Sequence, residues 1–195
     1  MITKKTIEDA GFLNVEQLEE NIFYIKNFLS KEDLSYSENI INNIPTDSWS
    51  TLNAEHQESW HNKFYDHNDS KLNDLIKNKI NNLMKIVPTL TLHGFNRLLR
   101  QSPENNMDAH VDEREDQRNG AIREYALVLY LNDNYDGGNL SYLNLGIQIK
   151  PEAGSLMIFK TGPKYLHEVK MVTGNNPRYC LPAFAFSGWL DNHNR

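Results

Sequence analysis

The chain has 195 residues, and its 20 lysines and arginines against 26 aspartates and glutamates give a formal net charge of −6. This length suits one domain with a sizeable core, and the mild acidity argues against nucleic acid or an anionic membrane as the main partner. The single cysteine, Cys180, excludes an intrachain disulfide and a cysteine-based zinc site. It fits a reducing compartment, so a cytoplasmic location is expected.

Nothing in the sequence divides the chain by a repeat or a long linker, which predicts a single catalytic domain over residues 1–195. Its start lacks the apolar core of a signal peptide, and no apolar run approaches the roughly 20 residues of a membrane-spanning helix. Residues 1–88 are expected to form a mainly helical support region with an irregular loop, and residues 89–190 a β core.

The first elements alternate between strand and helix. Residues 21–29 mix aromatic and β-branched types, which favours a strand. Ser30 begins a capping sequence, so we expect a helix over residues 31–44 that ends before Pro45. The polar segment 46–68 has weak periodicity and reads as a long loop or irregular strands.

Aromatic side chains in segment 46–68 have two open interpretations. Trp49, Trp60 and Tyr65 could form a substrate-facing flap, since loops on a rigid scaffold often carry recognition. Core packing explains them equally well.

A second helix is predicted after Ser70, which is the expected N-cap, and before Pro88. Its apolar residues fall on one face at helical spacing and indicate a helix that faces the core, with no need for a cofactor. These residues are Leu72, Leu75, Ile76, Ile80, Leu83 and Met84.

Beyond Pro88 the chain becomes rich in short strand patterns. Residues 125–131 are almost wholly apolar and suit a buried strand, while Asp136-Gly137-Gly138 is a hairpin signal. Helices followed by many short strands predict an α+β fold with a sandwich or barrel. The other strand candidates are residues 90–101, 110–112, 140–145, 147–150, 155–160, 166–172 and 178–186.

Chemistry concentrates at His110, Asp112 and His167. Side chains at i and i+2 of a strand share a face, so His110 and Asp112 could bind one ion while His167 arrives from another strand. Two imidazoles and one carboxylate form the ligand set of non-haem Fe(II) oxygenases. Taken alone, His110 and Asp112 could equally be a solvated pair. Arg178, eleven residues after His167, offers a bidentate fork for a carboxylate.

The segment from His110 to Trp189 resembles the catalytic region of the Fe(II)/2-oxoglutarate-dependent dioxygenases, in their prolyl 4-hydroxylase-like branch. Seven short blocks in the family's order carry the resemblance. They are His-Val-Asp at 110–112, Tyr-Leu-Asn-Asp at 130–133, Gly-Gly-Asn-Leu at 137–140, Pro-Glu-Ala-Gly-Ser-Leu-Met-Ile-Phe at 151–159, Leu-His-Glu-Val at 166–169, Val-Thr-Gly at 172–174 and Arg-Tyr at 178–179.

The resemblance implies a double-stranded β-helix (a jelly-roll barrel) with N-terminal helices packed against it. His110, Asp112 and His167 would ligate Fe(II), and Arg178 and Tyr130 would bind the distal carboxylate of 2-oxoglutarate. O2 would be the oxidant, and ascorbate is a candidate additional cofactor. Family members that halogenate lack a carboxylate where this chain has Asp112, so hydroxylation is expected.

Three departures from the family are visible. Leu99-Arg100-Gln101 stands where many relatives have a tyrosine that lines the cofactor site. Pro182 stands where relatives often have threonine or serine. The basic residue is Arg178 rather than the lysine usual in prolyl 4-hydroxylases, as in the oxygen-sensing prolyl hydroxylases.

A prolyl residue in a peptide or protein is the leading expected substrate, and a free amino acid or small metabolite is the alternative. The acidic balance of the chain mildly favours a neutral or basic peptide. Two other classes remain open. A zinc hydrolase would use the same His-Asp-His set with an activated water but would leave Arg178 without a role. A non-enzymatic jelly-roll binding module would need none of these residues. The oligomeric state is also left open.

Overall fold

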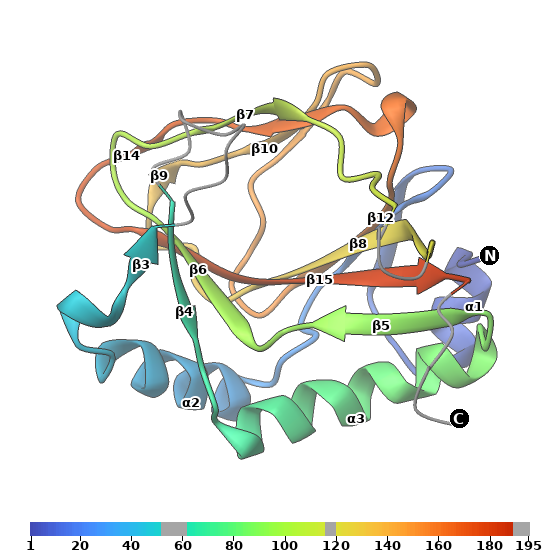
Figure 1. The fold of residues 1–195 in the computed structure, drawn as a ribbon, viewed down its shortest axis with the longest axis horizontal. Coiled ribbons are helices and arrows are strands. Elements are labelled where there is room, and N and C mark those ends of the chain that lie inside the picture. Colours follow the sequence, from blue (N-terminus) through green and yellow to red (C-terminus); the bar gives the residue numbers. More distant parts are fainter. Residues whose placement is uncertain (52–61, 116–119, 189–195) are drawn as a thin grey trace.

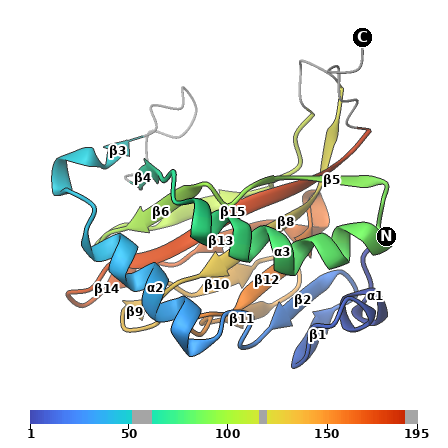
Figure 2. The same cartoon turned by 90° about the horizontal axis from the view of Figure 1, so that it is seen from below.

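Three layers make up the fold in this computed structural model, which describes residues 1–51, 62–115 and 120–188 (Figure 1). A small antiparallel sheet forms one outer layer and a large antiparallel sheet the middle one. The helices α2 (Lys31–Asn42) and α3 (Ser70–Ile86) lie across the other face of the large sheet (Figure 2). The expected α+β class with a double-stranded β-helix core is confirmed.

The large sheet has nine strands in the order β1-β2-β12-β8-β15-β6-β4-β3, with β5 also paired to β15. Its long central strands, β8 and β15, are antiparallel partners over almost their whole length. The strands are β1 (Val15–Glu19), β2 (Ile22–Ile25), β3 (Ser50–Thr51), β4 (Lys63–Asp66), β5 (Leu90–Gly94), β6 (Arg97–Gln101), β8 (Ile122–Tyr130), β12 (Leu156–Lys160) and β15 (Arg178–Ser187).

The small sheet has four strands in the order β11-β10-β13-β7, and a separate pair joins β14 to β9. These strands are β7 (Met107–His110), β9 (Asp136–Gly137), β10 (Leu140–Tyr142), β11 (Ile147–Ile149), β13 (His167–Val169) and β14 (Val172–Thr173). Short 3-10 helices, η1 (Thr46–Ser48) and η2 (Pro163–Tyr165), lie in the connections.

Strand β8 is apolar on both faces because each face meets a different layer. Leu127 and Leu129 belong to the core between the large sheet and the helices. Ala126 and Tyr130 point the other way, into the core between the two sheets. This two-sided burial explains why residues 125–131 show no alternation of polar and apolar types, and it confirms the buried strand expected there.

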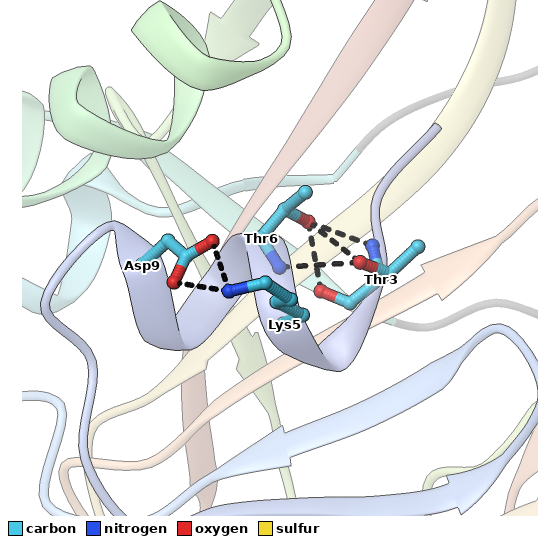
Figure 3. A network of polar contacts seen from close by, with 4 residues as sticks. All are labelled: Thr3, Lys5, Thr6 and Asp9. Atoms are coloured by element: carbon cyan, nitrogen blue, oxygen red, sulfur yellow. Dashed lines mark hydrogen bonds and ion pairs between the residues drawn. The ribbon is translucent and has the colours of Figure 1, made fainter.

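The N-terminal helix α1 (Lys4–Asp9) was not expected from the sequence. A reciprocal capping box begins it: the backbone N–H of Thr6 donates to Thr3 Oγ1, and the backbone N–H of Thr3 donates to Thr6 Oγ1 (Figure 3). Lys5 pairs with Asp9 one turn later. Ile7 is fully buried, so the helix packs as part of the core.

Helix α3 has the predicted apolar face but a different cap. Leu72, Ile76, Ile80 and Leu83 are buried as expected. Asp69, not Ser70, is the N-cap, since its Oδ1 accepts a hydrogen bond of 2.7 Å from the backbone N–H of Leu72. A carboxylate at this place also interacts favourably with the helix dipole.

The region before Pro88 contributes more to the sheets than the mainly helical description allowed. Four strands come from it, and β2 pairs directly with β12 in the large sheet. Only Ile22–Ile25 of the expected strand 21–29 is extended. Within the described residues no helix is long and apolar enough to cross a membrane.

Two predictions about turns are wrong. The expected strand 90–101 is broken in two, because Phe95 adopts a positive φ of 62° between β5 and β6. Asp136-Gly137-Gly138 does not turn a hairpin: Gly137 pairs with Val172 of the distant β14. A Cβ at Gly137 would lie 2.2 Å from the carbonyl oxygen of Met171, so the glycine serves close approach of two backbones.

Candidate metal centre and active-site pocket

His110 and His167 face each other on two paired strands of the small sheet. His110 ends β7, His167 begins β13, and the two are register partners. Their ring centroids are 4.3 Å apart. Asp112 lies beyond the end of β7, so the prediction that His110 and Asp112 alternate along one strand is wrong. The carboxylate reaches the histidines from the segment after the strand.

The three side chains nevertheless converge on one point. Asp112 Oδ1 is 3.7 Å from His110 Nε2, and Asp112 Oδ2 is 3.6 Å from His167 Nε2. One ligand atom from each residue lies within 4.8 Å of the other two. Atoms that each lie about 2.1 Å from a shared ion are at most about 4.2 Å apart. Both histidine–aspartate separations therefore suit a single divalent cation.

Backbone contacts hold both imidazoles in the form that can bind a metal. His110 Nδ1 is 2.7 Å from the carbonyl oxygen of Asp108, and His167 Nδ1 is 2.9 Å from that of Tyr165. A carbonyl oxygen can accept but not donate, so Nδ1 carries the proton in each ring. The Nε2 lone pairs then face Asp112. Such a bond on the far nitrogen is the usual support of a metal-binding histidine.

The surroundings of His167 keep it neutral. The residue is 4% exposed and packs against Phe159, with ring centroids 5.0 Å apart, and against Tyr142. Burial lowers the pKa of His167, and the nearby Asp112 carboxylate opposes that shift. A neutral imidazole keeps its lone pair for a cation.

A cavity of about 300 Å³ opens between the two sheets at this site, and the three ligand residues line it. Alternate residues of β8 and β15 form the opposite wall, because side chains two apart on a strand share a face. These residues are Tyr130, Val128 and Ala126 on β8, and Arg178, Cys180, Pro182 and Phe184 on β15.

Arg178 is a buried cation at one end of this wall. It is 2% exposed, and among the described residues no carboxylate pairs with it. Its Nη1 donates to Gln101 Oε1 at 3.2 Å and approaches Cys180 Sγ at 3.8 Å, while Nε has no partner in the described part of the chain. An unpaired buried charge is costly, so this end of the cavity fits an anionic ligand.

Tyr130 lies against the same guanidinium. The Arg178 Cζ is 5.0 Å from the centroid of the Tyr130 ring. Burial raises the pKa of the Tyr130 hydroxyl, and Arg178 only partly offsets that effect. The hydroxyl therefore stays protonated and can donate to an anion. Arg178 and Tyr130 are thus adjacent, as their expected shared role requires.

Two residues near Arg178 were missed from the sequence. Gln101 occupies one of the positions where relatives carry a tyrosine, and it orients Arg178 while its own Nε2 donates to the Asn105 carbonyl at 3.0 Å. Tyr135 packs beside Arg178: a Cβ at Gly138 would lie 2.9 Å from the Tyr135 ring and 3.3 Å from Arg178 Cδ. Glycine at 138 leaves room for both. No local pattern marks these contacts.

Segment 46–68 contributes one residue to the cavity wall, Phe64. Trp49 instead packs on Tyr65 and Tyr179, with centroid distances of 5.9 Å, and belongs to the core beside the helices. Trp60 lies outside the described residues. Pro182, which replaces the family's hydroxyl residue, is part of the cavity wall.

Three more cavity residues were not singled out from the sequence: Arg97, Arg114 and Arg123. They come from β6, from the segment after Asp112, and from β8. Because they are far apart in the sequence, no spacing rule could have grouped them.

Comparison with known proteins points to one superfamily. The model of the 2OG-Fe(II) oxygenase superfamily matches residues 94–189. A stretch of 57 residues is 36% identical to prolyl 3-hydroxylase 2 of Mus musculus. This stretch covers 27% of the chain and 8% of that protein, so the chain corresponds to less than a tenth of the length of the curated relatives it matches.

Solved structures share the fold at low sequence identity. A prolyl hydroxylase from Trichoplax adhaerens, in complex with a hypoxia inducible factor oxygen degradation domain peptide fragment, superposes with a TM-score of 0.69 at 19% identity over 94% of this chain and 91% of that one. The viral collagen prolyl hydroxylase of Paramecium Bursaria Chlorella virus-1, in its 2OG complex, gives a TM-score of 0.64 at 16% identity over 86% and 97% of the two chains.

Proposed function

The chain belongs to the 2OG-Fe(II) oxygenase superfamily, and from this premise we propose that it is a hydroxylase that uses Fe(II), 2-oxoglutarate and O2. One observation carries the proposal. A His-Asp-His set and a buried, unpaired arginine line the same cavity between the two sheets. The first suits a divalent iron with open coordination positions, and the second suits the distal carboxylate of a keto acid.

Each residue has a stated task in this proposal. His110, Asp112 and His167 would hold Fe(II), with both imidazoles fixed by their Nδ1–H bonds to backbone carbonyls. Arg178 would bind the distal carboxylate of 2-oxoglutarate through its planar fork, and the Tyr130 hydroxyl would donate to the same group. When bound, the iron and the keto acid supply the oxidising chemistry that inserts oxygen from O2 into a C–H bond.

The rest of the wall would exclude water from the reacting atoms. Phe64, Val128, Pro182 and Phe184 bring apolar surface to the cavity. Such a wall suits an apolar target group, and it protects reactive chemistry from solvent. These features match a prolyl ring as target, and the peptide-bound Trichoplax relative supports a peptide substrate. A free amino acid or small metabolite is the alternative substrate.

A zinc hydrolase is less well supported by the same cavity, because it would leave the buried cation of Arg178 without an anion. We also propose a reducing, cytoplasmic location, in which the free thiol of Cys180 stays reduced. Ascorbate remains a proposed additional cofactor, and turnover with and without it tests that role.

The function is tested by succinate formation. Protein purified without oxygen, loaded with Fe(II) and given 2-oxoglutarate and prolyl peptides should form succinate, whereas His110→Ala and Asp112→Ala should not. His93→Ala is the matched control, since His93 is exposed on β5 and is no part of the cavity wall. If the wild type forms no succinate and binds no 2-oxoglutarate, as judged by a visible Fe(II) absorption band, the proposed function is wrong.

A further inference from the structure

The cavity is longer than its cofactor end requires. On β15, the wall residues Arg178 and Phe184 are six positions apart, which at about 3.3 Å per residue places their Cα atoms roughly 20 Å from each other. A small dicarboxylic keto acid anchored at Arg178 spans a fraction of that distance. The Phe184 end of the cavity is therefore left for the substrate.

This second end is cationic. Arg97, Arg114 and Arg123 line the cavity together with the buried Arg178, whereas its wall contains one carboxylate, that of Asp112. The proposed metal site uses Asp112, and the proposed keto acid uses Arg178. Three arginines remain in a chain whose net charge is −6. The local charge is thus opposite to the charge of the whole molecule.

The arginines are held in different ways. Arg97 is fixed by Asp66 of β4, with Nη2 3.0 Å from Asp66 Oδ2. Arg123 lies flat on Phe184, with Cζ 3.9 Å from the ring centroid, and its backbone N–H donates to the Arg114 carbonyl at 3.0 Å. This bond places Arg114 beside Arg123. Arg114 is exposed and makes no ion pair with the described residues.

We propose that the substrate presents a carboxylate to Arg114 and Arg123 while its target group lies at the metal centre. The proposal rests on the proposed function and names the substrate class for the same site. An arginine stacked on an aromatic ring keeps a planar edge suited to a carboxylate, and an exposed arginine next to it adds attraction from solution. The acidic residue of a peptide and the carboxylate of a small amino-acid-like substrate would meet the same two side chains.

This assignment reverses the expectation from composition. The acidic balance of the chain favours a neutral or basic peptide, but binding depends on the charge near the site rather than on the net charge. A neutral or basic substrate would leave three cavity arginines without an interaction partner on the substrate.

The test compares three labelled prolyl peptides that differ next to the proline: one with aspartate, one with asparagine and one with lysine. Their binding to the Mn(II) and 2-oxoglutarate complex of the whole chain is followed by fluorescence anisotropy, and turnover is followed with Fe(II). The aspartate peptide should bind most tightly, and its affinity should fall with added salt. Free proline and its N-acyl derivative distinguish a small substrate from a peptide, because either would then match the aspartate peptide.

Arg114→Gln should weaken binding of the aspartate peptide about two- to five-fold, the range for an exposed ion pair, and leave the asparagine peptide unchanged. Arg114→Glu should shift the preference toward the lysine peptide. Lys77→Gln is the charge-matched control, since Lys77 is exposed on α3, on the helical side of the large sheet. It should change nothing.

Binding of 2-oxoglutarate separates this inference from the proposed function. Arg114→Gln should bind 2-oxoglutarate as the wild type does. If neither the acidic peptide nor the acidic small molecules bind better than their neutral counterparts, or if Arg114→Gln keeps the full preference, the inference is overturned while 2-oxoglutarate binding still supports the oxygenase. Failure to bind 2-oxoglutarate would instead overturn the proposed function.

Discussion

At the scale of single residues, the site depends on burial of a charge that the protein itself does not neutralise. Arg178 is 2% exposed, and within the described ranges its polar contacts are an amide oxygen and a thiol rather than a carboxylate. Folding therefore places a cation where it is unfavourable until an anion arrives. Such a residue improves ligand binding at the expense of stability.

Replacing Arg178 should therefore change stability and binding in opposite directions. Arg178→Met should raise the free energy of unfolding of the ligand-free protein by about 1–2 kcal/mol, because an unpaired buried charge is removed. It should weaken 2-oxoglutarate binding by about 30-fold or more, because the carboxylate loses its charged partner. Thermal unfolding and calorimetric titration measure the two effects. A destabilised variant that still binds 2-oxoglutarate would contradict the proposed anchor.

Cys180 gives a second test at this scale. The thiol is 2% exposed, and burial raises its pKa, while Arg178 partly opposes that shift. Because the thiolate is the reactive form, a raised pKa means less thiolate at any pH below it. In the native protein at pH 8, Cys180 should react with a thiol reagent far more slowly than in denaturant. Equal rates in both conditions would show that the wall around Cys180 is open.

At the scale of elements, strand register and helix caps set the site. The pairing of His110 with His167 fixes two metal ligands at once, and the β8–β15 pairing builds the opposite wall. Below that wall, α3 covers the large sheet through its apolar face. The start of α3 depends on Asp69, which also accepts a hydrogen bond of 2.9 Å from the Tyr36 hydroxyl of α2.

Asp69 and its neighbour offer a matched pair of substitutions. Asp69→Ala should lower the free energy of unfolding by about 1–2 kcal/mol, because the Leu72 N–H and the Tyr36 hydroxyl both lose an acceptor. Ser70→Ala should stay within about 0.5 kcal/mol of the wild type, since Ser70 lies inside the helix and does not cap it. Urea denaturation distinguishes the two. The reverse order would restore Ser70 as the cap.

At the scale of the whole molecule, two sheets are held together by a core that contains a cavity. The residues between the sheets include several large aromatic side chains, and the cavity of about 300 Å³ lies among them. The metal ligands come from the small sheet and the segment after β7, while Arg178 comes from the large one. Ligands that bind on both sides would therefore link the two sheets.

Ligand binding should for that reason stabilise the entire fold. Fe(II) or Mn(II) together with 2-oxoglutarate, at 100 times their dissociation constants, should each add about 2.7 kcal/mol if they bind the native state alone. Calorimetry without oxygen should show a higher Tm with both ligands, and EDTA should reverse it. In Asp112→Ala the metal should raise the Tm much less. An unchanged Tm for the wild type would argue against the site.

Sequence by itself determined the donor types, their order along the chain, the apolar face of α3 and the buried strand at residues 125–131. These features are local: a 3.6-residue period, an unbroken apolar run and short motifs can each be recognised within a few residues. Family resemblance then linked His110, Asp112, His167, Arg178 and Tyr130. The α+β class also followed from the order of helical and strand patterns.

Only the tertiary structure decided how distant segments meet. It placed Asp112 beyond its strand, paired β2 with β12, put Gln101 and Tyr135 beside Arg178, and gathered Arg97, Arg114 and Arg123 along one cavity. Strand register between remote segments depends on the packing of whole faces, and no short stretch of sequence specifies it. The cationic substrate end of an acidic protein is the consequence that composition could not reveal.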